Sequence, residues 1–358
     1  MYIMLRNLTV NIMAAFIPDR DRRHAFRNRY RRRSKFRKLR DDNRRLFNEN
    51  AAIRAELDLL RRTTLMMFSA SVVKPLEDTP KGSGTTSAYL SIVSVAKNEG
   101  PYLREWLEYH KIVGVDRFYF YDNGSTDNTR EILEPYINDG TVVYRYVEGR
   151  YIQRLVYQDA IYRYRQHSRW MAFIDLDEFI VPTKSDSLPE VLRDYEMYPA
   201  LVANWVHFDC GGHEKKPTAN GGLVTANFTR ARKDHNEDNG FHSDKGIKSI
   251  VNPAKVITYN IHCGFYYDNQ RAVTEKFEPM VPAASMTGAH SSEIIRINHY
   301  HSKSKEEYLS KINRNQGFVS APTTQFDDES LEFSVETYDD LVIQRFLPDL
   351  KKALGIKN

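Results

Sequence analysis

Three carboxylates follow a short apolar stretch near the middle of the chain. Residues 170–174 are all apolar, and Asp175, Asp177 and Glu178 come directly after them. In an extended chain, Asp175 and Asp177 would point to one face and lie about 6.5–7 Å apart. Two carboxylates on one face at a strand end suit a hard divalent cation that keeps open positions for phosphate oxygens. The alternative is a strand that ends in a solvated acidic turn.

Two histidines near residue 300 could complete such a site. His299 and His301 alternate in a short predicted strand, so both would face one side of it. Imidazole is a plausible additional ligand for Mn²⁺ that carboxylates already hold. We expect one of the two to be a ligand and the other a structural partner. The position within residues 297–304 favours His301 over His299 as the ligand. Lys303 and Lys305 follow and could touch phosphate.

The elements that must position these residues alternate along the chain. Strands are predicted over 89–96, 117–121, 141–146 and 170–175, and helices over 103–113, 129–138 and 153–167. This alternation predicts an α/β fold with a mostly parallel sheet and helices on both faces. Ligands of such sheets bind at the carboxyl ends of the strands. Three of these strands are followed by polar pairs, namely Asn98 and Glu99, Asp122 and Asn123, and Asp175 and Asp177.

Four motifs in this order carry a family resemblance. They are residues 94–99 (SVAKNE), 121–127 (YDNGSTD), 175–179 (DLDEF) and 297–304 (INHYHSKS). Together they resemble the motif set of the family-2-like and family-92 glycosyltransferases, which have a Rossmann-like GT-A fold. The resemblance covers roughly residues 89–317. It implies a nucleotide-sugar donor, usually UDP-linked, a Mn²⁺ or Mg²⁺ ion on the D-x-D motif and a glycan acceptor.

The resemblance also implies roles for individual residues. Asp122 would read the nucleobase, residues near Lys97 and Glu99 would line the nucleoside site, and Lys248 would face phosphate. The alternative for Lys248 is a solvated lysine on a strand. The loop at 208–213 keeps the family's His213 but has Asp209 where glycine is common. The residues expected to bind the donor are Lys97, Asn98, Glu99, Asp122, Asn123, Asp127, Asp175, His213 and Lys248.

The chemistry expected from these residues is metal-assisted glycosyl transfer, in the synthesis of a cell-surface polysaccharide or another glycan. The chain has no glycine-rich phosphate loop, so a metal must carry much of the diphosphate charge. An inverting reaction also needs a carboxylate to deprotonate the acceptor. Asp209, Glu237 and Asp238 are the candidates, and the last two lie in a polar stretch, 230–244, that is typical of a mobile loop. A metal-dependent nucleotidyl or phosphodiester enzyme and a catalytically silent membrane scaffold are the alternatives.

The basic charge of the chain is concentrated near the N-terminus. Residues 19–40 contain twelve Lys and Arg against two Asp, whereas the whole chain carries a net charge of +5. Residues 1–38 therefore form a basic, amphipathic segment that we expect on an anionic membrane surface. A nucleic-acid-binding arm and a solvated helix are the alternatives. Leucine and isoleucine at heptad spacing over 39–60 predict a short coiled coil, spanning 39–73, and self-association.

The remaining composition sets the expected domain order and compartment. Residues 74–88 are rich in Pro, Gly, Ser and Thr and predict a linker to a GT-A domain at 89–320, which a helical extension at 321–358 follows. No run approaches the roughly 18 apolar residues of a membrane span. With only two cysteines, no disulfide framework is expected, which favours a reducing compartment. We expect a cytoplasmic protein that is peripheral on the membrane, without specific nucleic-acid binding.

Overall fold

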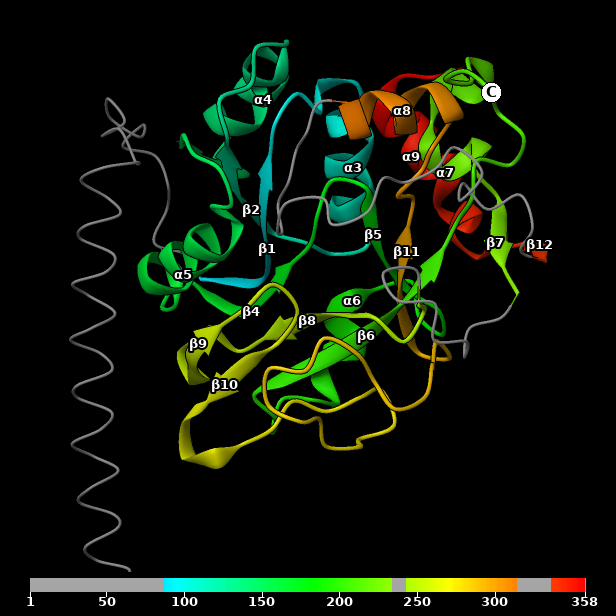
Figure 1. Ribbon diagram of the computed structural model, residues 1–358. Coiled ribbons are helices and arrows are strands. Elements are labelled where there is room, and N and C mark those ends of the chain that lie inside the picture. The colour runs from blue at the N-terminus through cyan, green and yellow to red at the C-terminus, as the bar shows by residue number, and fades with distance from the viewer. Residues whose placement is uncertain (1–86, 234–242, 314–335, 358) are drawn as a thin grey trace, which may run out of the picture. The chain divides into compact units, whose positions relative to one another are not determined.

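The computed structural model describes residues 87–233, 243–313 and 336–357. The predicted basic segment, coiled coil and nearly all of the linker lie outside these ranges. So do Glu237 and Asp238, two of the three candidate bases. The GT-A domain predicted for 89–320 falls mostly within them (Figure 1).

The first half of the described chain builds a parallel sheet. Its strands are β1 (Ala88–Ala96), β2 (Arg117–Asp122), β3 (Val142–Tyr146) and β4 (Ser168–Phe173). Strand β1 pairs in parallel with β2 on one side and with β4 on the other, and β2 pairs in parallel with β3. These are the four strands that the alternating pattern predicts, with ends that differ by a residue or two.

The second half extends this sheet to eight strands. The added strands are β5 (Glu178–Pro182), β6 (Ala200–His207), β8 (Ile247–Val251) and β11 (Ile295–His299), and the sheet order is β3-β2-β1-β4-β8-β6-β11-β5. Strand β8 is antiparallel to both β4 and β6, and β5 is antiparallel to β11, whereas β6 and β11 are parallel. Residues after β6 and β11 therefore emerge side by side at one end of the sheet.

Strand β4 illustrates why the sheet is covered on both faces. Trp170 and Ala172 pack into one hydrophobic core, whereas Met171 and Phe173 pack into a second core on the other face. All four are fully buried. A continuous apolar run is typical of a strand with no solvent-facing side, so the prediction from residues 170–174 is confirmed. Truncating Trp170 to alanine would cost about 3–5 kcal/mol of unfolding free energy.

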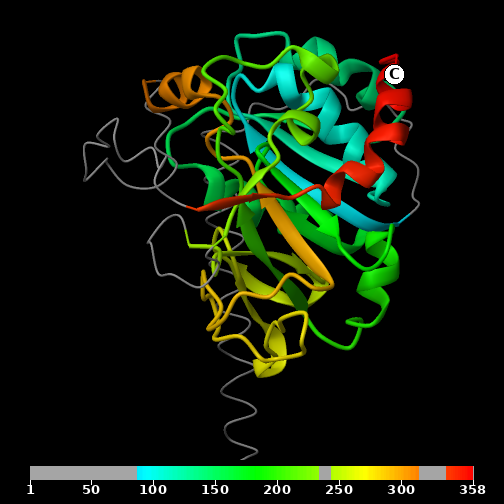
Figure 2. The same cartoon turned by 90° about the vertical axis from the view of Figure 1, so that its right-hand side faces the viewer.

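Helices lie on both faces, as predicted. The first core receives side chains from α3 (Gly100–Ile112), α4 (Thr129–Asn138), α6 (Leu188–Arg193) and α9 (Leu347–Leu354). Figure 2 shows α9 beside α3. The second core receives side chains from α5 (Gln153–Tyr164) and from the hairpin of β9 (Val256–Tyr259) and β10 (Gly264–Tyr266).

The C-terminal part packs against the sheet, but it is not purely helical. Strand β12 (Thr337–Asp339) pairs with β7 (Arg230–Arg232), and the 3-10 turn η6 (Val342–Phe346) leads into α9. Next to β12, Asp340 forms a buried ion pair with Arg296 of β11 at 2.6 Å. The stretch 230–244, expected to be a loop, therefore begins with a strand, because β12 supplies a partner for β7. The short helices α7 (Val224–Asn227) and α8 (Lys305–Asn313) complete the part that surrounds the site.

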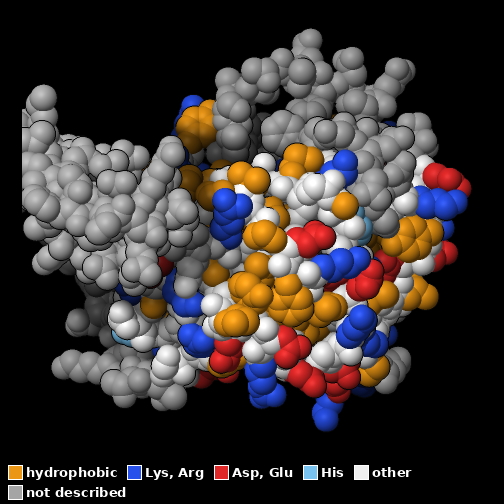
Figure 3. All heavy atoms as spheres, turned by 90° about the horizontal axis from the view of Figure 1, so that it is seen from below, with side chains coloured by type: hydrophobic (Ala, Val, Ile, Leu, Met, Phe, Trp, Pro, Cys, Tyr) orange, Lys and Arg blue, Asp and Glu red, His pale blue; other side chains and the backbone are white. Residues whose placement is uncertain are grey.

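Three surface and composition features bear on the sequence predictions. Among the described helices, none is long and apolar enough to cross a membrane. Cys210 and Cys263 are both free and buried. The face seen from below in Figure 3 mixes basic, acidic and hydrophobic side chains, with a hydrophobic group near its middle.

Candidate active site

The loops that follow β1 and β2 are tied to each other. Asn98 adopts a left-handed backbone conformation, with φ of 58°, and its Oδ1 accepts a hydrogen bond from the Thr126 backbone at 2.7 Å. Asp127 accepts from the backbone N–H of Gly100 at 3.0 Å and from that of Thr129 at 3.1 Å. These bonds join the first turns of α3 and α4, so Asn98 and Asp127 hold the loops in place.

A cavity of about 340 Å³ lies at the carboxyl ends of these strands. It is lined by Lys97, Asn123, Gly124, Tyr146, Glu148, Gly149 and Arg150. Two of the residues expected at the nucleoside site, Lys97 and Asn123, are among them. Asp122 is not, because it is buried and its two oxygens accept from the Ser125 N–H and the Tyr144 hydroxyl, each at 2.7 Å. Direct contact of Asp122 with a nucleobase would require its buried carboxylate to become exposed.

The D-x-D motif lies in a turn between β4 and β5. Strand β4 ends at Phe173, β5 begins at Glu178, and the Glu178 N–H donates to the Asp175 carbonyl at 3.1 Å. The expectation of an extended chain with both carboxylates on one face is therefore wrong. Asp175 and Asp177 instead have different partners, because the turn directs them to different sides.

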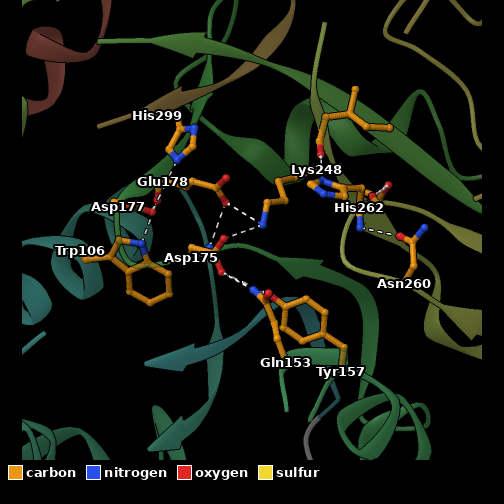
Figure 4. Close-up of polar contacts among 12 residues, drawn as sticks. Trp106, Gln153, Tyr157, Asp175, Asp177, Glu178, Lys248, Asn260, His262 and His299 are labelled. Carbon is orange, nitrogen blue, oxygen red and sulfur yellow. Dashed lines mark hydrogen bonds and ion pairs between the residues drawn. The ribbon is translucent and has the colours of Figure 1, made fainter. Parts of the chain in front are cut away.

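Asp175 is held by α5 and β8. Its Oδ1 accepts from Gln153 Nε2 at 2.6 Å, and its Oδ2 accepts from Lys248 Nζ at 2.8 Å (Figure 4). The Lys248 ammonium is also 3.3 Å from Glu178 Oε2. The side chains of Lys248 and Glu178 are 2% and 0% exposed, so Lys248 is not a solvated strand lysine.

One ammonium thus faces two carboxylates in a buried place. Burial raises the pKa of Glu178 to about 8. The positive charge of Lys248 opposes this shift, and the negative charge of Asp175 adds to it. Burial alone would lower the pKa of Lys248, but Asp175 and Glu178 hold it above its ordinary value. We infer that, at neutral pH, the Lys248 charge is balanced by Asp175 while Glu178 retains its proton.

Asp177 faces α8 and the end of β11. Its Oδ2 accepts from Lys311 Nζ at 2.6 Å, and its Oδ1 lies 3.8 Å from His299 Nε2. Burial would raise the pKa of Asp177, but the Lys311 ammonium holds it well below its usual range. Burial lowers the pKa of His299 well below its usual range, although Asp177 opposes this shift. The pair is therefore an ionised carboxylate beside a neutral imidazole.

This pair fits a divalent cation. Metal ligands must be deprotonated, which is the state of both groups. A separation of 3.8 Å is too long for a hydrogen bond, yet it is less than twice a metal–ligand bond of about 2.0–2.2 Å. Within the described ranges, no group of three or more His, Cys, Asp or Glu side chains could hold a metal. A cation here would take its other ligands from substrate and water.

His301 lies farther from this point than its place in the motif suggests. Its ring centroid is 5.5 Å from that of His299, and the ring packs edge-on against Tyr308. Its carbonyl accepts from Lys311 at 3.3 Å. Strand β11 ends at His299, so the expected alternation of the two rings on one strand face does not continue to His301. The geometry favours His299 as the ligand.

The family of the chain follows from a comparison with known families. The model of glycosyltransferase family 92 matches residues 93–338, which is more than half of the chain. The chain belongs to glycosyltransferase family 92. Together with the mixed, largely parallel sheet, this confirms the predicted fold class and the family resemblance.

Individual family-92 relatives match shorter stretches. A glycosyltransferase family 92 protein of Oryza sativa subsp. japonica is 32% identical over 113 residues, which is 31% of this chain and 19% of that protein. Galactan beta-1,4-galactosyltransferase GALS2 of Arabidopsis thaliana is 37% identical over 107 residues, 27% of this chain and 20% of that protein. The chain thus matches only about a fifth of the length of these relatives.

Solved structures include a distant match. The crystal structure of S. aureus TarS 1-349 is 13% identical in sequence, with a TM-score of 0.35 over 68% of each chain.

Other residues predicted for the family-92 site lie at its edges or are structural. Glu99, just before α3, is 3.6 Å from Lys303 Nζ. His213 contacts the Asn227 carbonyl through Nε2 at 3.2 Å, which ties its loop to α7. Asp209 accepts from the Gly211 N–H at 2.7 Å and thereby closes a tight turn after β6.

Several residues of this candidate site were not found from the sequence. Lys311 on Asp177 and Gln153 on Asp175 are two of them. His207 and Asp244 are two others, and they contact each other at 2.5 Å. A signal existed for His207, because the apolar run at 200–208 predicts a strand and His207 lies near its carboxyl end. No local pattern marks Asp244, which we expected in a polar loop and which is buried.

Proposed function

We propose that this chain transfers a sugar from a nucleotide-diphosphate donor, of the UDP-sugar type, to a glycan acceptor with the help of Mn²⁺ or Mg²⁺. The observation that carries the proposal is the approach of His299 Nε2 to Asp177 Oδ1 at 3.8 Å, beside Lys311 and the buried Lys303 at the carboxyl end of the sheet. A bound cation would neutralise charge on the leaving diphosphate.

The chain's own cations support a diphosphate at this place. Lys303 is 8% exposed, adopts a left-handed φ of 51° and stacks its ammonium 3.6 Å from the ring centroid of Tyr102. Lys216 approaches the same ring at 4.3 Å. Burial lowers the pKa of Lys303, against the effect of Glu99, so an arriving phosphate would strengthen its charged form. We propose that Lys303 and Lys311 contact the diphosphate.

The nucleoside would enter the cavity lined by Lys97 and Asn123. Its volume of about 340 Å³ is at the lower end of the range for small-molecule sites. Of the three candidate bases for an inverting reaction, Asp209 is the one within the described residues. It follows β6, whose end lies next to that of the parallel strand β11. Relatives named galactan beta-1,4-galactosyltransferases support transfer of a sugar to a polysaccharide.

The deciding experiment is a screen of nucleotide sugars for metal-dependent hydrolysis. We expect release of UDP from one or a few UDP-sugars with Mn²⁺ or Mg²⁺, and none with a chelator. Asp177→Asn should lower kcat at least about 100-fold, since the negative charge facing His299 is lost. Asp186→Asn is the matched control, because its side chain is 85% exposed. Full turnover in the chelator would refute the metal role, and a nucleotidyl product without free or transferred sugar would refute glycosyl transfer.

A further inference from the structure

Four side chains form a continuous buried chain of polar contacts. Asp244 Oδ1 lies 2.5 Å from His207 Nδ1, His207 Nε2 lies 3.2 Å from His299 Nδ1, and His299 Nε2 lies 3.8 Å from Asp177 Oδ1. The first two contacts have hydrogen-bond lengths and the third does not. This series of polar contacts therefore runs from a buried carboxylate just before β8 to the D-x-D turn.

The backbone and the aromatic neighbours fix the two rings. Asp244 Oδ1 also accepts from the His207 backbone N–H at 3.0 Å, so this oxygen is held on two sides. His207 and His299 are paired residues on the parallel strands β6 and β11. Trp205 packs against both rings, with centroids 5.5 and 5.0 Å away. Gly246 lets Trp205 lie there, because a β-carbon at Gly246 would come within 2.1 Å of the indole.

The placement of protons follows from these contacts. A carboxylate can only accept, so His207 donates from Nδ1 to Asp244. When the His207 ring is neutral, its Nε2 carries a lone pair and accepts from His299 Nδ1–H. His299 Nε2 then also carries a lone pair, which points at the ionised oxygen of Asp177. Two acceptors that face each other at 3.8 Å repel, and a cation between them removes that repulsion.

We propose that Asp244 and His207 are positioning residues that hold His299 in the tautomer whose Nε2 is available to a divalent cation shared with Asp177. In the opposite tautomer, an N–H would occupy the side that faces Asp177. That pattern would require His207 to donate from both nitrogens and carry a positive charge. The inference rests on the proposed metal-dependent function and extends it to two residues that do not face the cation themselves.

The first test measures binding of Mn²⁺ alone to the full chain by calorimetry. His207→Leu removes the acceptor for His299 Nδ1–H, and we expect affinity to fall about 10- to 100-fold. His207→Gln can present an amide oxygen near the position of Nε2 and should stay within about threefold of the wild type. The exposed His167 provides the matched control, and His167→Leu should leave affinity unchanged. Unchanged affinity in His207→Leu would overturn the inference.

The second test does not depend on any variant folding. Nitrogen-15 NMR of the histidine-labelled, metal-free wild type should place the proton of His299 on Nδ1 and leave Nε2 bare. A proton on His299 Nε2 would overturn the inference, as would a wild type that binds no Mn²⁺. If Mn²⁺ binds and the tautomer is as expected but no nucleotide sugar is hydrolysed, the proposed function fails and the positioning role stands. If donors are hydrolysed and His207→Leu binds Mn²⁺ normally, the positioning role alone fails.

Discussion

Lys248 and Asp175 are 73 residues apart in the chain, and their side chains meet with Nζ 2.8 Å from Oδ2. The contact joins β8 to the turn that follows β4. Strands β4 and β8 are antiparallel neighbours in the sheet. Glu178 lies on the same ammonium at 3.3 Å. The side chains of Lys248 and Glu178 are 2% and 0% exposed, whereas that of Asp175 is 34% exposed, so water can reach Asp175 but not Glu178.

Removal of the ammonium should therefore be costly. We expect Lys248→Met to lower the free energy of unfolding by about 3 kcal/mol, at the low end for a buried ion pair, because Asp175 loses its cation but is 34% exposed to water. Adding Asp175→Asn should recover part of the loss, because it removes the carboxylate that the Lys248 ammonium balances. Urea denaturation at pH 7 measures both.

Lys276→Met provides the matched control for this prediction. Lys276 pairs with Glu293 at 2.9 Å, but the two side chains are 50% and 63% exposed. Because water screens such an exposed pair, its loss should change the free energy of unfolding far less than the loss of Lys248. Equal losses from the two lysine variants would contradict the assignment of Lys248 to a buried charge cluster.

The two motif histidines should differ in metal binding. We expect His299→Ala to weaken binding of Mn²⁺ in the presence of UDP at least about tenfold, because His299 Nε2 faces Asp177 at 3.8 Å. His301→Ala should have the smaller effect, which is the reverse of the order that the motif alone favours. Calorimetry with both variants measures the difference. A larger effect of His301→Ala would restore the order predicted from the sequence.

The sheet could be predicted from the sequence because its signals are local. The apolar run at 170–174 and the turn residues after each strand place β1 to β4 to within one or two residues. The convergence of strand-end residues follows from parallel pairing, and the structure brings Asp175, Asp177, Lys248 and His299 into one site. Period and composition carry this information without reference to distant parts of the chain.

The roles of individual side chains were harder to predict because they depend on partners far along the chain. Asp122 looks like a ligand-binding carboxylate in its motif, but Tyr144 on the neighbouring strand occupies it. Asp244 looks like part of a polar loop, yet its side chain is buried and contacts His207. Strand β11 ends at His299, two residues before His301, and this separates the two rings. Pairing and burial decide such cases, and neither has a local signal.

His110 should make stability depend on pH in a mildly acidic range. It is buried on α3, where its Nδ1 donates to the Trp106 carbonyl and its Nε2 accepts from the Ile180 N–H, an arrangement that requires a neutral ring. Burial lowers the pKa of His110 to about 3. Below pH 6.5 the unfolded chain takes up a proton that the folded chain refuses. The contribution of neutral His110 to the free energy of unfolding is therefore complete above pH 6.5 and is lost as the pH falls toward 3.

The test compares unfolding free energies at pH 6.5 and pH 5. His110→Gln should be less stable than the wild type at both pH values. Its unfolding free energy, however, should fall by about 2 kcal/mol less than that of the wild type between pH 6.5 and pH 5, since one such group contributes about 1.4 kcal/mol per pH unit. His167→Gln, at an exposed position, should keep the wild-type pH dependence. If His110→Gln keeps it too, His110 is not the group responsible.

The last prediction concerns the basic segment, whose sequence carries a net charge of +10 within residues 19–40. Each Lys or Arg close to an anionic bilayer contributes about 1 kcal/mol, and the attraction is screened over a Debye length. Replacing Arg31, Arg32 and Arg33 by glutamine in the full chain should therefore weaken binding to phosphatidylserine vesicles by about 3 kcal/mol, roughly 150-fold. Added salt should weaken binding of the wild type and narrow this difference.

The control for this experiment neutralises three exposed lysines of the described part, Lys184, Lys276 and Lys352. That variant has the same net charge as the arginine variant, so a general charge effect would change both equally. We expect only the arginine variant to lose vesicle binding, and we expect both to retain donor hydrolysis, since the residues of the candidate site lie after residue 96. Equal vesicle binding by the two variants would refute a membrane role for the segment. Tight, salt-dependent binding to RNA or DNA without a preference for vesicles would indicate a nucleic-acid-binding arm instead.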